Sequence, residues 1–319
     1  MRAVNKNCEN QRQFQPSVKK RIKKYAPLYL LATPSILYLI INNYMPMIGL
    51  TLAFKKFSFS KGIFGSPWNG LGNFKYLFGS KWAGIMFRNT VLYNIAFLIL
   101  GTVLAVTVAI ILNEIVHPRA KKIYQTVILI PHLFSMVIVG YIVFAFLSGT
   151  NGFINKSILE PMGIEGVNWY TEAKYWPFIL TFVSLWKGFG FQSIVYYATL
   201  VGFDSTLYEA AMVDGATKGQ QIRCITLPLL KPTVIILTIM ALGRMFNSDF
   251  GLFYQVPQNS GLLYTTTTTI DTYVYRGLMQ LGDIGMSSAA GLYQSVVGFI
   301  LVLTANFVVK KVSAEDALF

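Results

Sequence analysis

The residues that point most directly to a function lie in a short polar segment between two apolar stretches. From Glu209 the segment reads Glu-Ala-Ala, three residues, Gly215, nine residues, Ile225, one residue, and then Leu227-Pro228. The two alanines leave little side-chain bulk, so the surface of another protein could approach the backbone closely. We interpret the segment as a docking element.

Local signals predict a helix at the start of this segment. Thr206 and Glu209 have the spacing of a capping box, in which two side chains satisfy backbone donors at a helix start. The helix should therefore begin at Leu207. Gly215 can adopt the left-handed conformation that commonly ends a helix.

A second short helix should follow the glycine. Thr217 and Gln220 form another, weaker capping box. Pro228 has no amide hydrogen and disfavours a helical conformation for Leu227, so we expect this helix to stop there. The prediction for residues 201–229 is a helix, a glycine turn and a helix at a membrane surface.

The spacing of the segment resembles the signature loop of permease subunits in binding-protein-dependent ABC importers. In that family the loop sits in a cleft of a cytoplasmic ATPase subunit and passes ATP-driven movement to the transmembrane helices. The alternative is an ordinary amphipathic connector between two spans. The resemblance implies an ATPase-coupling role for Glu209, Ala210, Ala211, Asp214, Gly215, Ile225, Leu227 and Pro228.

The composition is that of a membrane protein. Hydrophobic residues make up 54% of the 319 residues and charged residues 13%, whereas soluble domains carry about 25% charged residues. The mean hydropathy is +0.51. Stretches of about 20 apolar residues can cross a bilayer, and the candidates are 28–52, 89–115, 124–148, 176–200, 230–252 and 287–309.

We therefore predict an all-α, polytopic membrane protein with six transmembrane helices and a cytoplasmic helix-turn-helix coupling loop. Its expected parts are a basic N-terminal tail (1–27), a permease domain (28–309) and a C-terminal tail (310–319). The segments then assigned to the cytoplasm hold 16 Lys and Arg residues and the outer segments nine, which favours cytoplasmic termini. The loop 51–88 is an exception, because it is basic although it is assigned to the outside. The N-terminal tail usually dominates the orientation, so we keep the assignment.

Other classes of function find little support in the residues. The net charge of +14 is better explained by basic residues that set the orientation in the membrane and bind anionic lipid headgroups than by nucleic-acid binding. Cys8 and Cys224 both fall on the predicted cytoplasmic side, where a disulfide is not expected. His117 and His132 have no companions at metal-site spacing. The chain has no phosphate-binding loop, so ATP and magnesium should be bound by partner ATPase subunits and no cofactor by this chain.

Charged residues at membrane depth are costly and usually face a cavity or one another, which makes Lys187, Arg244 and Asp249 candidates for function. A sugar needs aromatic faces beside amide or charged groups. The alternatives are packing, interfacial aromatic belts, and a salt bridge to a partner. The candidate substrate path consists of Trp186, Lys187, Phe189, Gln192, Tyr196, Arg244, Asn247, Asp249 and Tyr254.

Further stretches narrow the resemblance to a branch of the sugar-permease family associated with complex carbohydrates and aldouronate-type oligosaccharides. They are Phe246 to Val256, Asp271 to Arg276, Gly282 to Met286, Gly291 to Ser295 and Ala317 to Phe319. The resemblance implies a bacterial cell-membrane permease that imports oligosaccharides by alternating access. Its implied partners are a second homologous permease, an ATPase dimer and an extracellular solute-binding lipoprotein. Lys187 and Arg244 hint at an acidic sugar.

Two rival classes stay open at this point. An ion-coupled secondary transporter would need no ATPase, but it would more often show discontinuous helices in two repeated halves. A membrane-embedded enzyme would need a catalytic constellation at membrane depth. Neither explains the spacing between Glu209 and Pro228.

Overall fold

The computed structural model describes residues 18–312. The predictions for Cys8, for the rest of residues 1–17 and for residues 313–319, including Ala317 to Phe319, lie outside this described part. Across residues 18–312 the regular elements are helices, and one isolated β-bridge joins Lys55 to Trp68. The predicted all-α class is confirmed.

The chain divides into two compact units, residues 1–51 and residues 52–319. The first unit contains α1 (Val18–Leu39), the π-helical turn η1 (Ile40–Tyr44) and most of the 3₁₀ segment η2 (Met45–Phe54). Side chains from Tyr25 to Ile48 are exposed. The first unit therefore forms no buried core of its own from these side chains.

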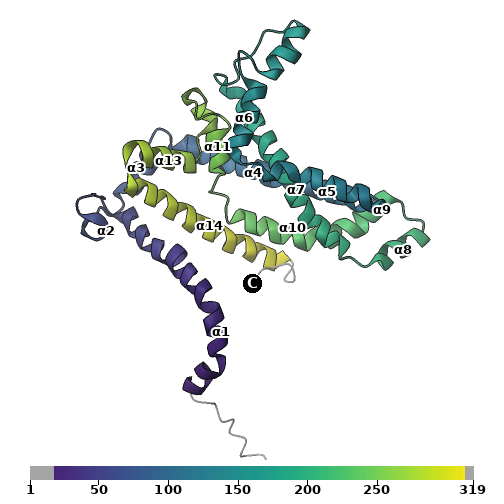
Figure 1. The fold of residues 1–319 in the computed structure, drawn as a ribbon, viewed down its shortest axis with the longest axis horizontal. Helices are drawn as coiled ribbons and strands as arrows, with labels where there is room; N and C mark the ends of the chain where they lie inside the picture. The colour runs from purple at the N-terminus through teal and green to yellow at the C-terminus, as the bar shows by residue number, and fades with distance from the viewer. Residues whose placement is uncertain (1–17, 313–319) are drawn as a thin grey trace, which may run out of the picture. The chain divides into compact units, whose positions relative to one another are not determined.

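The second unit contains the remaining elements. They are α2 (Gly62–Gly65), α3 (Gly72–Gly79), α4 (Ala83–Glu114), α5 (Pro118–Leu133), α6 (Met136–Leu147), η3 (Asn155–Leu159), η4 (Glu160–Met162), η5 (Ala173–Tyr175), α7 (Trp176–Val201), α8 (Ser205–Val213), α9 (Lys218–Gln221), η6 (Ile222–Thr226), α10 (Leu227–Leu242), α11 (Phe250–Gln255), η7 (Gly261–Leu263), α12 (Tyr264–Thr267), α13 (Ile270–Leu281) and α14 (Ile284–Val312). Figure 1 shows α8 and α9 at one end of this unit and α3 and α13 at the other.

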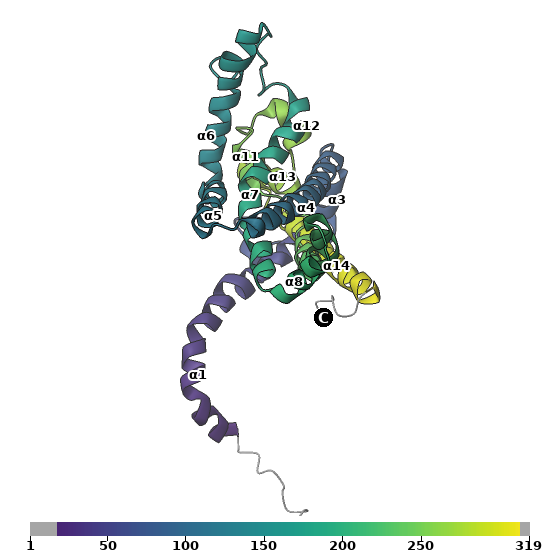
Figure 2. The same ribbon diagram turned by 90° about the vertical axis from the view of Figure 1, so that its right-hand side faces the viewer.

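Five helical stretches in the described part are long and apolar enough to cross a membrane: Tyr25–Phe54, Ala83–Glu114, Ala173–Val201, Lys218–Leu242 and Ile284–Lys311. A sixth span exists if α5 and α6 are counted as one, although they meet at an angle of 93°. Figure 2 shows α6 turning away from the end of α5. The predicted continuous helix over 124–148 is therefore broken.

Residues from two neighbouring elements stabilise this break. The hydroxyl of Ser135 accepts a hydrogen bond from the Ile138 N–H and so caps the start of α6. The ammonium group of Lys187, on α7, donates to the carbonyl of His132 at 3.1 Å. A cation at a helix C-terminus satisfies an orphan carbonyl and interacts favourably with the helix dipole.

The fifth predicted span, 230–252, also differs from the structure. Helix α10 ends at Leu242, and residues 243–249 form a link that is not part of a regular helix before α11 begins. The Asn94 amide donates to the carbonyls of Met245 and Asn247, each at 3.0 Å. The Gln294 amide donates to the Phe246 carbonyl at 2.7 Å. Distant side chains thus replace the helical hydrogen bonds that the link gives up.

Small residues allow the long helices of the second unit to pack closely. Helix α4 packs mainly against α7. Ala105 and Ala109 of α4 are buried in one cluster with Tyr196 and Leu200 of α7 and Leu230 of α10. Small residues at membrane-helix interfaces let backbones approach. This packing holds α4, α7 and α10 around a common space.

The segment after α11, which contains the threonine run Thr265 to Thr269, folds onto α4. The Asn89 amide donates to the Thr265 and Thr268 carbonyls, and the Thr90 hydroxyl accepts from the Ile270 N–H at 3.0 Å. Thr267, Thr268 and Thr269 are buried. The threonine run therefore has a packing role.

Candidate functional site

The helix pair in residues 201–229 begins two residues earlier than predicted. Helix α8 starts at Ser205 because the Asp204 carboxylate accepts a hydrogen bond from the Thr206 N–H at 3.0 Å. That hydrogen bond lowers the pKa of the Asp204 carboxyl. The predicted capping box is wrong, since Glu209 instead accepts a hydrogen bond from the Ser205 hydroxyl at 3.2 Å. An aspartate before the helix is a strong N-cap and takes precedence.

The predicted glycine turn is confirmed. Gly215 has a φ of +77°, in the left-handed region. The Ala216 N–H donates to the Ala211 carbonyl at 2.8 Å, and the Gly215 N–H donates to the Met212 carbonyl at 3.1 Å. This pair of bonds is the Schellman motif, which satisfies the last carbonyls of a helix.

The second helix begins as predicted but does not end as predicted. Thr217 and Gln220 form a complete capping box at the start of α9. The helix then continues through the π-helical turn η6 into α10, so the stop expected at Leu227 is wrong. The Leu227 N–H donates to the Ile222 carbonyl, five residues back. We attribute the continuation to this wider turn, which takes up an extra residue just before a proline that has no N–H to donate.

The surface of the helix pair is open to a partner. Among the residues with an expected coupling role, Glu209, Ala210, Asp214, Gly215, Leu227 and Pro228 are exposed, and Ala211 and Ile225 are half-buried. Lys218 of α9 forms an ion pair with Glu114 at the end of α4, at 2.9 Å. This ion pair holds α9 against the end of α4, while the surface of α8 remains exposed.

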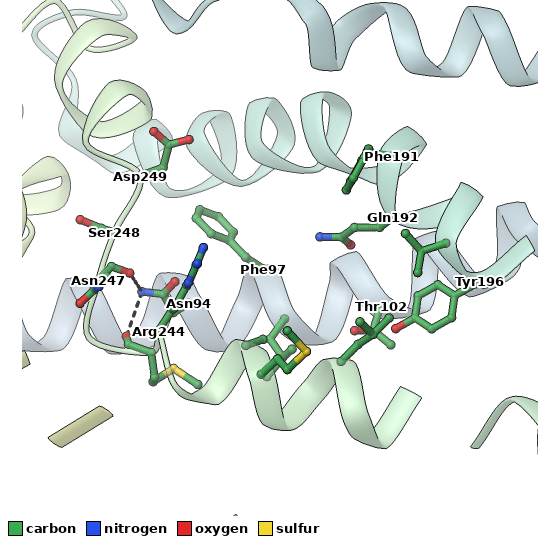
Figure 3. Close-up of a pocket in the computed structure, with 16 residues that line it drawn as sticks. Asn94, Phe97, Thr102, Phe191, Gln192, Tyr196, Arg244, Asn247, Ser248 and Asp249 are labelled. Carbon is green, nitrogen blue, oxygen red and sulfur yellow. Dashed lines mark hydrogen bonds between the residues drawn. The ribbon is translucent and has the colours of Figure 1, made fainter. Parts of the chain in front are cut away.

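A cavity of about 920 Å³ lies among α4, α7, α10 and the link 243–249. Figure 3 shows polar groups of the link and Asn94 at one end and Gln192, Thr102 and Tyr196 at the other, with Phe97 between them. The cavity is lined by Asn94, Phe97, Leu98, Thr102, Phe191, Gln192, Val195, Tyr196, Leu237, Met240, Ala241, Arg244, Met245, Asn247, Ser248 and Asp249.

The structure places five of the nine predicted substrate-path residues in this lining: Gln192, Tyr196, Arg244, Asn247 and Asp249. The other four lie elsewhere. Trp186 packs against the core cluster around Trp176. Lys187 donates its hydrogen bond to the His132 carbonyl at the end of α5. Tyr254 stacks on Phe250 with ring centroids 4.9 Å apart. Phe189 is half-buried and does not line the cavity.

The two charged groups of the cavity have different surroundings. One Asp249 carboxylate oxygen accepts from the Leu252 N–H at 3.1 Å and caps α11. Arg244 is exposed in the cavity, and no carboxylate among residues 18–312 lies within ion-pair distance of its guanidinium group. The cavity therefore offers a guanidinium group that no described carboxylate binds directly, although the Asp249 carboxylate lines the same space.

Sequence reasoning missed several residues of this site. Asn94, Thr102 and Ser248 supply polar groups to the lining. The carboxylate of Asp271, outside the lining, accepts hydrogen bonds from the Ser248 N–H and hydroxyl. An amide such as Asn94 within an apolar span could have been found by the same cost argument that singled out Arg244.

Comparison with known proteins identifies the class of this chain. Residues 101–314 match the family model described as the binding-protein-dependent transport system inner membrane component. The chain belongs to this family. It is a multi-pass membrane permease subunit and not itself an enzyme.

Relatives of this permease agree over most of its length. It is 34% identical to Protein LplB of Bacillus subtilis, over 92% of each chain. It is 33% identical to the polygalacturonan/rhamnogalacturonan transport system permease protein YteP of the same species, over 90% of this chain and 89% of that protein. None of these comparisons supports an ion-coupled transporter.

Two solved structures share the fold. One is of a bacterial ABC transporter involved in import of the acidic polysaccharide alginate, with a TM-score of 0.85, 33% identity, and coverage of 93% of this chain and 100% of the other. The second is the bacterial alginate ABC transporter with an alginate pentasaccharide-bound periplasmic protein, with a TM-score of 0.84, 32% identity, and coverage of 93% and 99%.

Proposed function

We propose that this permease moves oligosaccharides, including acidic ones that contain uronate units, from an extracellular binding protein into the cytoplasm. The observation that carries the proposal is the cavity of about 920 Å³ in which Arg244 stands without a carboxylate partner in the described part of the chain. The names of the relatives, which include a polygalacturonan and an alginate transporter, support the same substrate class.

The chemistry of the cavity suits a sugar. The rings of Phe97 and Phe191 can pack against the C–H face of a pyranose, and Gln192 and Asn247 can bond its hydroxyls. A guanidinium group binds a carboxylate in a bidentate, charge-assisted manner. Arg244 would thus select acidic units, while the rest of the lining would accept neutral ones.

Movement would come from other chains. The exposed surface of α8 would dock on a cytoplasmic ATPase dimer that binds ATP and magnesium, and this chain would bind no cofactor. A second homologous permease and a solute-binding lipoprotein would complete the importer, with both termini of this chain in the cytoplasm. Alternating access would follow from the continuous helical path that leads from α9 to α10 and then to Arg244.

The test is uptake of labelled uronic-acid and neutral oligosaccharides into cells that carry the complete transporter. Arg244→Gln removes the charge, and we expect the half-saturating concentration for acidic sugars to rise about tenfold or more, as for loss of a charged hydrogen bond. Uptake of neutral sugars should not change. Arg119→Gln is the matched control, because Arg119 is exposed on the first turn of α5 and does not line the cavity.

An equal loss for acidic and neutral sugars in the Arg244 variant would contradict the assigned selectivity. Uptake that needs both ATP and an intact Glu209 would establish the importer. Uptake that follows an ion gradient and is unaffected by Glu209→Lys would overturn it.

A further inference from the structure

A hydroxyl pair connects α8 to the helix that follows it. The phenol oxygen of Tyr208 lies 3.1 Å from the hydroxyl oxygen of Thr226. Tyr208 is half-buried and only 3% of Thr226 is exposed. The two residues are 18 positions apart, so the contact exists only because the glycine turn folds α8 back onto the start of α10.

Thr226 is the last residue of the π-helical turn η6. Its hydroxyl also donates to the Gln221 carbonyl at 3.5 Å. Either hydroxyl can be the donor in the pair, because each carries one proton and can also accept a hydrogen bond. Isolated π turns within longer helices occur frequently at functional sites, and their wider hydrogen-bonding ring makes them points where a helix can change register.

The same turn has a second attachment to the helix pair. Gln221 is 3% exposed, and its amide donates to the Ala216 carbonyl at 3.2 Å, just after the glycine turn. One bond therefore fixes α8 and another fixes the connection between α8 and α9. The first bond ends on Thr226, the last residue of η6, and the second on Gln221, the residue just before η6.

From η6 the path to the cavity is direct. Helix α10 runs from Leu227 to Leu242, a length of roughly 24 Å at 1.5 Å per residue. Arg244 follows two residues later. A displacement of the base of α10 would therefore reach the polar end of the cavity without passing through a flexible segment.

We propose that Tyr208 is a positioning residue that passes movement of α8 to α10 through its hydrogen bond to Thr226 at the π turn. This inference rests on the proposed function, in which α8 docks on an ATPase. Without the bond, α8 can shift on its partner while η6 and α10 stay in place. ATP hydrolysis would then continue with less sugar moved.

The experiment uses the full transporter with its partner chains in liposomes and measures sugar transported per ATP hydrolysed. Tyr208→Phe removes only the hydroxyl. We expect the ratio to fall about fivefold, the scale of one neutral hydrogen bond, while the ATPase rate and subunit assembly stay near those of the unaltered complex. Tyr124→Phe, at an exposed tyrosine of α5, is the matched control and should change nothing.

Thr226 supplies independent variants. Thr226→Val should lower the ratio as Tyr208→Phe does, and Thr226→Ser should keep the unaltered value because the hydroxyl is retained. The double variant Tyr208→Phe with Thr226→Val should be no worse than either single one, as expected for two residues that act through one contact. If Tyr208→Phe does not assemble, the comparison of serine with valine at Thr226 still decides.

An unchanged ratio in Tyr208→Phe and Thr226→Val would overturn the inference while leaving the importer intact. Additive losses in the double variant would also overturn it, because the residues would then act separately. If the unaltered complex showed no ATP-driven uptake, the proposed function itself would be wrong.

Discussion

At the scale of single residues, backbone conformation sets the turn between α8 and α9, and charge sets what the cavity can bind. Gly215 is needed for its φ of +77° and not for space, because a methyl group there would meet no atom within 4 Å. Arg244 matters because its guanidinium group faces the cavity and forms no ion pair with a described residue. Substitution of Gly215 should therefore affect the conformation of the turn, whereas substitution of Arg244 should affect the selection of charged substrates.

Gly215→Ala should destabilise the turn by about 1–2 kcal/mol, the cost of a left-handed conformation for a residue with a Cβ. We expect reduced uptake at an unchanged level of protein in the membrane. Gly219→Ala is the control, since Gly219 is exposed in α9 without positive φ and also has open space around it. Uptake at matched expression, together with hydrogen exchange of residues 211–216, measures the effect. Equal behaviour of the two variants would contradict the conformational argument.

At the scale of elements, the helices are held together by close backbone contacts. Where a helix is interrupted, side chains from other elements bind the backbone groups that have lost their helical partners. Gly190 of α7 is buried against the Ile128 backbone of α5, whereas Gly188 on the same helix faces open space. Lys187, which the sequence suggested for substrate binding, bonds the end of α5 instead. The α5–α7 contact is therefore a structural support beside the cavity residues Phe191 and Gln192.

Gly190→Ala should separate α5 from α7, because a Cβ at this position would overlap the carbonyl group of Ile128. Overpacking of this kind costs about 1–3 kcal/mol. We expect a lower midpoint of thermal unfolding in detergent, measured for the purified transporter by intrinsic fluorescence. Gly188→Ala should leave the midpoint unchanged, and a similar decrease in both variants would show that the contact is not tight.

At the scale of the whole molecule, the arrangement of charge and the distribution of helices define two ends of the second unit. Cys224 is exposed in η6, between α9 and α10, and Glu165 is exposed in the connection between α6 and α7. If α7 crosses the membrane once, these two positions lie on opposite sides. In the proposed orientation, which the excess of basic residues favours, the Cys224 side faces the cytoplasm.

This topology predicts opposite labelling by a membrane-impermeant maleimide in a Cys8→Ser background. Cys224 should react only after the cells are permeabilised, while a Glu165→Cys variant that also carries Cys224→Ser should react in intact cells. Western-blot detection of the labelled chain gives the result. Labelling of Cys224 in intact cells would reverse the orientation and exclude docking of α8 on a cytoplasmic ATPase.

The sequence by itself determined the features that depend on neighbours along the chain. Hydropathy located the long membrane helices, Gly215 defined its turn, and Thr217 with Gln220 defined the start of α9. The cost of charge in an apolar stretch singled out Arg244 and Asp249, which both line the cavity, and Lys187, which does not. Each of these signals acts within a few residues or within a single span, so no knowledge of distant contacts was needed.

Only the tertiary structure decided where a helix ends within a stretch that is apolar enough to continue as a span. The link 243–249 leaves the helix because its backbone groups are bound by Asn94, Asp271 and Gln294, between 23 and 153 positions away in the chain. The break between α5 and α6 is satisfied by Lys187, 55 positions away. A buried backbone group must find a partner, and a local pattern cannot show which distant side chain the fold will bring to it.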